Sequence, residues 1–225
     1  MSLRPIVENA PTSSGAPNER GTSKRKSHDF RYEVSTKARC ASQLVQLLSF
    51  LSSRSGGRPI VYLLNDQRPA RQFGPEEISR LDGLQCDGVA TLPELLAQGA
   101  IPLRTQSARI VVSDFLFPDD PAAIVRRLSA GAGSLWLLQV LSGWEANPTE
   151  LGGRRLVDLE STQHADLRIN RQRIAEYQAR LKQLQTDWTT AARSVHATFV
   201  TLVAEEGLPM ICRDVLRREG ILIDA

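Results

Sequence analysis

The stretch ARIVVSDFLFPDD, residues 108–120, contains the pattern that decides the fold class. Three consecutive apolar residues at 110–112 end abruptly at Ser113 and Asp114. A continuous apolar run of this kind is typical of a strand that is covered on both faces of a parallel sheet. Asp114 then has two possible roles. It either caps or hydrogen-bonds the neighbouring loop backbone, or it lies at the edge of a sheet where a ligand is held.

Further apolar runs, separated by segments of helical periodicity, surround this stretch. Residues 59–64, 134–142 and 197–205 are predicted to be buried strands, whereas residues 154–161 and 165–169 alternate as exposed antiparallel strands do. Helices are predicted at 34–54, 76–81, 92–98, 121–129 and 171–193, with a short one at the C-terminus that is capped at Gly220. The sequence therefore predicts a doubly wound α/β domain, with a mostly parallel sheet and helices on both faces.

The length and composition indicate one globular domain. A chain of 225 residues can bury a sizeable core, and we expect residues 1–225 to form a single domain. No apolar run approaches the roughly 20 residues that a membrane-spanning helix needs, and the first residues lack the apolar stretch of a secretory signal. Cys40, Cys86 and Cys212 are dispersed, which indicates free thiols rather than disulfides or a zinc site. We therefore expect a cytoplasmic protein.

The basic residues are concentrated near the N-terminus. Residues 1–40 carry a formal charge of +4, whereas the whole chain carries +3. The rest of the chain is therefore slightly acidic. Ser, Pro, Gly and charged residues at about 9–33 predict a flexible basic loop. The cluster from Lys24 to Lys26 is of a kind that contacts nucleic acid or anionic lipid. No aromatic residues interleave with this cluster, which favours a solvated loop over a nucleic-acid site.

The motifs of several common enzyme classes are absent from the sequence. It contains no GxxxxGK[ST] phosphate loop, no GxGxxG turn after a strand and no GxSxG nucleophile elbow. Asp119 and Asp120 precede Pro121 and are explained by helix capping. One enzymatic alternative stays open, a metal-dependent phosphoesterase or hydrolase that uses Asp114 with Asp66 or Asp87. No general base or nucleophile at a fixed spacing supports it.

The order of elements and several short stretches resemble a known bacterial family. The stretches are IVVSDFLFPDDP, LLQVLSGWE, LVDLES, YQARLKQL and VLRREGIL. Together and in this order they are similar to the domain-of-unknown-function 58 family, whose members carry a von Willebrand factor A-like domain. The resemblance extends from about residue 34 to the C-terminus.

This resemblance implies a divalent-cation site of the metal-ion-dependent adhesion type at the top of the sheet. The family pattern combines a late aspartate, a hydroxyl from a middle loop and an Asp-x-Ser-x-Ser run. Asp114 matches the late aspartate and Thr91 the middle hydroxyl. Hydroxyl and carboxylate oxygens suit a hard cation such as Mg²⁺.

The Asp-x-Ser-x-Ser run is where the sequence departs from the family. The best match is IVENAPTSS, which places Glu8 and Thr12 at the first and last positions of the run. Ala10 stands at the middle position and cannot coordinate a metal. The implied site is therefore degenerate, and a domain that holds no cation stays an alternative.

The resemblance also implies a function, a non-enzymatic protein-interaction module. Its partner would be a MoxR-type AAA+ ATPase, and the pair would assemble or activate other proteins. Asp87, Phe115 and Trp144 are the candidate partner-binding residues, Trp144 because Trp is favoured at interface hot spots. The alternative for Trp144 is packing over the end of the sheet, and Trp136 and Trp188 are predicted to be core residues.

Overall fold

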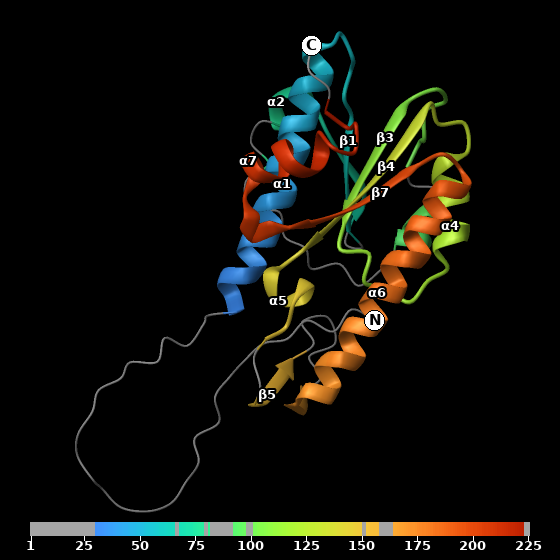
Figure 1. The fold of residues 1–225 in the computed structure, drawn as a ribbon. Coiled ribbons are helices and arrows are strands. Elements are labelled where there is room, and N and C mark those ends of the chain that lie inside the picture. The colour runs from blue at the N-terminus through green and yellow to red at the C-terminus, as the bar shows by residue number, and fades with distance from the viewer. Residues whose placement is uncertain are drawn as a thin grey trace, which may run out of the picture.

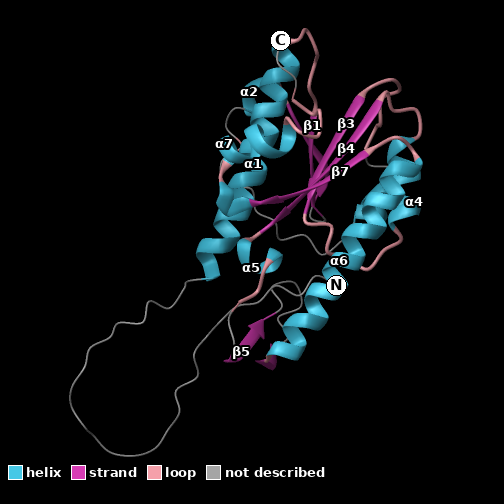
Figure 2. Cartoon of the chain, in the orientation of Figure 1, coloured by secondary structure: helices cyan, strands magenta, loops and turns pink. Residues whose placement is uncertain are grey.

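The structure is a computed structural model that describes residues 30–65, 68–78, 81, 92–97, 101–149, 152–157 and 164–222. Figures 1 and 2 show the arrangement of its helices and strands. The elements are α1 (Phe30–Arg54), β1 (Val61–Asn65), β2 (Arg68–Phe73), α2 (Pro75–Ile78), α3 (Leu92–Ala97), β3 (Ala108–Ser113), α4 (Pro121–Ser129), β4 (Ser134–Leu141), α5 (Gly143–Ala146), β5 (Gly152–Val157), β6 (His164–Ile169), α6 (Arg171–Ser194), β7 (Thr198–Val203), η1 (Ala204–Glu206), α7 (Leu208–Met210) and the π-helical turn η2 (Ile211–Leu216).

The centre of the fold is a three-stranded parallel sheet in the order β3-β4-β7. Ile110 on β3 lies opposite Trp136 on β4, and Trp136 lies opposite Thr198 on β7. Parallel neighbours need crossover connections, which α4 supplies between β3 and β4 and α6 supplies before β7. The predicted apolar strands at 109–112, 134–142 and 197–205 are thus confirmed as members of one parallel sheet.

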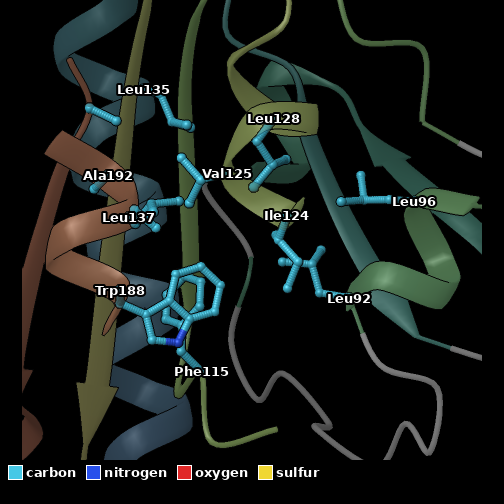
Figure 3. Close-up of a cluster of buried hydrophobic side chains, with 12 residues drawn as sticks. Leu92, Leu96, Phe115, Ile124, Val125, Leu128, Leu135, Leu137, Trp188 and Ala192 are labelled. Atoms are coloured by element: carbon cyan, nitrogen blue, oxygen red, sulfur yellow. The ribbon is translucent and has the colours of Figure 1, made fainter. Parts of the chain in front are cut away.

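Helices cover both faces of this sheet, which Figure 1 shows with α1 on one side and α4 and α6 on the other. On the α4 and α6 side, Leu135 and Leu137 pack in one cluster with Val125 and Trp188 (Figure 3). On the α1 side, alternate residues of the same strands pack with Leu44 of α1 and with residues of η2. Two apolar layers on either side of a sheet are the reason why its strands have continuous apolar runs.

The first strand differs from the prediction. Residues 59–64 were expected to join the parallel sheet, but β1 pairs antiparallel with β2, and Val61 lies opposite Phe73. Only residues 66 and 67 separate the two strands, a connection that allows a hairpin and is far too short for a parallel crossover. The hairpin packs through Val61 and Phe73 against Ile78 of α2 and Val45 of α1.

Two further predictions are settled by element boundaries. The antiparallel strands predicted at 154–161 and 165–169 correspond to β5 and β6, which form a separate two-stranded sheet. The flexible loop predicted at about 9–33 lies outside the described residues as far as residue 29, and α1 begins at Phe30. Residues 30–54 contain no Gly or Pro that would interrupt a helix. None of the helices in the described ranges has both the length and the apolar character required to span a bilayer.

Candidate functional site

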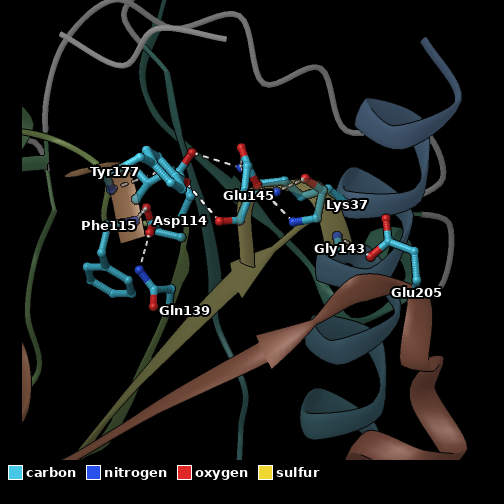
Figure 4. Close-up of polar contacts among 11 residues, drawn as sticks. Lys37, Asp114, Phe115, Gln139, Gly143, Glu145, Tyr177 and Glu205 are labelled. Atoms are coloured by element: carbon cyan, nitrogen blue, oxygen red, sulfur yellow. Dashed lines mark hydrogen bonds and ion pairs between the residues drawn. The ribbon is translucent and has the colours of Figure 1, made fainter. Parts of the chain in front are cut away.

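Charged side chains from three elements meet at the carboxyl-terminal edge of the parallel sheet (Figure 4). Asp114 directly follows β3, and Glu145 lies in α5 just after β4. The ends of neighbouring parallel strands reach the same edge, so these two side chains are brought together although 31 positions separate them. Lys37 of α1 lies between them. We refer to Lys37, Asp114 and Glu145 as the ionic triad.

The ammonium group of Lys37 binds both carboxylates of the ionic triad. Lys37 Nζ donates to Asp114 Oδ2 at 3.1 Å and to the two carboxylate oxygens of Glu145 at 2.9 and 3.0 Å. The side chains are only 18%, 13% and 14% exposed in the order Lys37, Asp114, Glu145. Burial by itself would lower the pKa of Lys37, but the two carboxylates outweigh it and raise the pKa above 10.5. Lys37 therefore carries its charge throughout the physiological pH range.

The loop after β3 has an unusual backbone that fixes Asp114. Phe115 has a φ of 53°, a left-handed conformation that is uncommon for a residue with a bulky side chain. The backbone N–H of Leu116 donates to Asp114 Oδ1 at 3.3 Å, closing a short turn. The backbone carbonyl of Asp114 accepts a hydrogen bond of 2.8 Å from Gln139 Nε2. The turn is thus held from both the loop side and the core side.

Gln139 links this loop to a polar network inside the core. Its side chain is fully buried on β4, and its Oε1 accepts hydrogen bonds from Thr201 of β7 at 2.8 Å and from Gln185 of α6 at 3.1 Å. Gln185 also donates to Thr201 Oγ1 at 3.3 Å. Every polar atom of the Gln139 amide group thus has a partner, and the network couples Asp114 to β7 and α6.

Replacing Gln139 with leucine is expected to lower the free energy of unfolding by about 2–3 kcal/mol, because it leaves the Asp114 carbonyl and the Thr201 hydroxyl short of buried partners. Urea denaturation followed by circular dichroism measures the change. Gln178→Leu is the matched control, since the Gln178 amide bonds Asn147 on the exposed face of α6 and its loss is worth at most about 0.5 kcal/mol. Equal losses in the two variants would contradict a structural role for the buried network.

The second half of the site is the turn that follows β4. Ser142 and Glu145 form a capping box, in which Ser142 Oγ accepts from the Glu145 N–H and the Glu145 carboxylate accepts from the Ser142 N–H. Tyr177 of α6 donates its hydroxyl to the Glu145 carbonyl at 2.8 Å. Burial and the nearby carboxylates of Glu145 and Asp114 raise the pKa of Tyr177, which keeps it a neutral donor. Glu205, in η1 after β7, accepts from the Gly143 N–H at 2.6 Å.

The structure places three of the residues chosen from the sequence. Asp114 directly follows β3, which is an outer strand of the described parallel sheet and not the central strand that was expected. Phe115 was expected to bind a partner, and this prediction is wrong, because its left-handed backbone turns the ring into the core, where it is 0% exposed against Trp188. Trp144 is half-buried, with its ring 6.3 Å from that of Tyr177, which agrees with packing over the end of the sheet. Glu8, Thr12, Asp66, Asp87 and Thr91 lie outside the described residues.

Sequence reasoning missed Lys37 and Glu145. Glu145 carried a usable signal, since Ser142 and Glu145 have the S-x-x-E spacing of a capping box directly after an apolar strand. Lys37 carried none, because a lysine in the first part of an amphipathic helix is ordinarily a solvated residue. Its contact with Asp114 spans 77 positions and depends on how α1 lies against the sheet.

The ionic triad bears on the cation that the family resemblance implies. Mg²⁺ requires oxygen ligands at about 2.0–2.1 Å. Asp114 Oδ2 instead accepts a hydrogen bond from an ammonium group that also binds Glu145, so a divalent ion there would face a like charge. Across the ranges that the structure describes, no group of three or more His, Cys, Asp or Glu side chains could hold a metal ion. The described residues around Asp114 therefore fit an ammonium group and do not fit a divalent cation.

The comparisons with protein-family models, curated proteins and solved structures found no match to this chain.

Proposed function

We propose that this chain is a non-enzymatic protein-interaction module of the von Willebrand factor A type. Its partner is a MoxR-type AAA+ ATPase, and the pair assembles or activates other proteins. The observation that carries the proposal is the ionic triad, which closes the carboxyl-terminal edge of a parallel sheet with charged side chains that are already paired. This edge is where α/β folds bind their ligands.

The stretches that resemble the domain-of-unknown-function 58 family support the same proposal. IVVSDFLFPDDP contains the end of β3 and the turn of Asp114, and LLQVLSGWE contains the end of β4 and the capping box of Glu145. YQARLKQL lies in α6 and supplies Tyr177, which binds the same turn. The sequence resemblance and the ionic triad thus concern the same edge of the sheet.

The geometry favours binding over catalysis at this edge. A general base or nucleophile needs a carboxylate that is available to a substrate. In the described part of the site, the Asp114 carboxylate instead accepts from Lys37 and from the backbone N–H of Leu116. An interaction module needs no available base, and rigid paired charges give a docking surface a fixed shape and field.

Direct binding to the ATPase tests the proposal. Biolayer interferometry with the full chain and the MoxR-type ATPase of the same cell should give saturable binding. Glu206, exposed in η1 beside the site, is the probe of the docking edge, and Glu206→Lys should weaken binding at least about tenfold through charge reversal at the interface.

Arg126→Glu is the control, because it reverses a charge by the same magnitude, with the opposite sign, at the other end of the sheet. Arg126 is exposed in the last turn of α4, which leads to the amino-terminal end of β4. Its binding should equal that of the unmodified chain. Absence of saturable binding, or an equal loss in both variants, would contradict the proposed function.

A further inference from the structure

We propose that Lys37 is the built-in cation of this site and takes the place that a divalent metal ion has in von Willebrand factor A domains. This inference deepens the proposed function and rests on it for its biological meaning. In chemical terms, the ammonium group of Lys37, which belongs to α1, bridges the carboxylates of Asp114 and Glu145. The docking edge then has its final charge and shape without any bound metal.

The first argument is the position of the ammonium group. Lys37 Nζ lies 3.1 Å from an oxygen of Asp114 and 2.9 Å from one of Glu145, and these carboxylates follow two adjacent parallel strands. A metal ion that bridges loops at the top of a sheet has the same kind of position, between oxygens that different strand ends present. One point in space cannot hold both cations. The position of Lys37 therefore excludes a metal ion that would bridge the same two carboxylates.

The second argument is the charge and burial of the triad. Two carboxylates that are 13% and 14% exposed would repel each other strongly if no cation lay between them. One ammonium group with three N–H donors satisfies both carboxylates and leaves the triad with one net negative charge. The requirement for a cation at this edge is thus met within the chain itself.

The third argument is that the triad is held rigidly from outside. Gln139 fixes the backbone of Asp114, while Tyr177 and the capping box with Ser142 fix the backbone and carboxylate of Glu145. Both carboxylates are therefore anchored whether or not Lys37 is present. Removal of the ammonium group should leave two aligned carboxylates that can accept a divalent cation in its place.

Mn²⁺ titration of the full chain, followed by electron paramagnetic resonance, tests this inference. The unmodified chain should show no Mn²⁺ binding that depends on Asp114 below about 10 mM. Lys37→Met should gain one site with a Kd of about 0.1–1 mM, the range of weak carboxylate sites. Lys37→Met combined with Asp114→Asn should lose that gain by at least about tenfold.

Each remaining outcome has a defined meaning. Submillimolar Mn²⁺ binding by the unmodified chain that is lost in Asp114→Asn would overturn the inference, as would a folded Lys37→Met variant that gains no site. Where Lys37→Met does not fold alone, the circular dichroism spectrum with 10 mM Mn²⁺ becomes the readout. Recovery of the native spectrum supports the inference, and no recovery contradicts it.

These readouts are separate from those of the proposed function, since none involves a partner protein. In the binding assay with the ATPase, the inference adds one expectation, namely that EDTA leaves the affinity unchanged. An EDTA-sensitive interaction would contradict the built-in cation while supporting the interaction module. A chain that binds neither Mn²⁺ nor the ATPase would contradict the function alone.

Discussion

Replacing Trp188 with alanine is expected to lower the free energy of unfolding by about 3–5 kcal/mol. The Trp188 side chain is 0% exposed on α6 and lies at the centre of an aromatic cluster. Its ring centroid is 4.7 Å from that of Phe115 and 6.0 Å from that of Phe199, the latter in a stacked arrangement. Alanine at this position removes the ring and leaves a cavity between α6 and the sheet. Urea denaturation followed by circular dichroism measures the loss.

Trp144→Ala is the matched control for this prediction, because Trp144 is only half-buried and contacts Tyr177 outside the central cluster. Its loss should be smaller than that of Trp188→Ala by at least about 1.5 kcal/mol, since part of the ring remains in water in the native state. Similar values for the two variants would mean that α6 does not pack on the sheet through Trp188.

Replacing Lys37 with methionine is expected to lower the free energy of unfolding by about 3 kcal/mol. Removing one partner from a buried ion pair typically costs about 3–5 kcal/mol, because the remaining charges stay desolvated without compensation. We expect the low end of this range because the carboxylates of Asp114 and Glu145 keep 13% and 14% exposure. Methionine replaces the four-carbon apolar part of the lysine side chain with an apolar chain of the same number of atoms and lacks only the terminal nitrogen, so the change reports mainly on the ammonium group. The measurement is again urea denaturation, at pH 7 and without divalent ions.

A triple variant distinguishes charge from packing. Lys37→Met combined with Asp114→Asn and Glu145→Gln removes all three charges, and it should recover at least half of the loss. Lys182→Met is the control for loss of a lysine, because Lys182 is exposed on α6 and its replacement should change stability by less than about 0.5 kcal/mol. No recovery in the triple variant would show that packing, and not the ion pairs, is what Lys37 contributes.

The sequence predicted those parts of the fold that depend on local patterns. Continuous apolar runs predicted β3, β4 and β7, because α1 packs on one face of their sheet and α4 and α6 pack on the other. The outer strand β3 is the least covered of the three, and its Ile110 is 37% exposed. Helical spacing predicted α1, α4 and α6 nearly to their ends. The strand β2 was missed because RPARQF has neither an apolar run nor alternation, and its pairing with β1 comes from the two-residue connection between them.

The candidate site was only partly predictable, for a different physical reason. Asp114 was found because a carboxylate that ends a buried strand is conspicuous in a sequence. The burial of Phe115 depends on a φ of 53°, which no composition or spacing indicates, and so its ring was assigned to the surface. Lys37 acquires its role only through the packing of α1 against two distant loops. Long-range contacts of this kind are absent from local periodicity.

The spacing of the ionic triad along the chain has a consequence for the order of folding. Lys37 meets Asp114 across 77 positions and Glu145 across 108, so these contacts close long loops, whereas each hydrogen bond within a helix closes a loop of only four residues. Contacts of such high sequence separation slow folding and are not expected before the sheet has formed. A chain whose sheet has formed before α1 packs on it would thus present two unpaired carboxylates at this edge, and only a chain that has completed its tertiary structure would offer a partner the bridged triad with its single net negative charge.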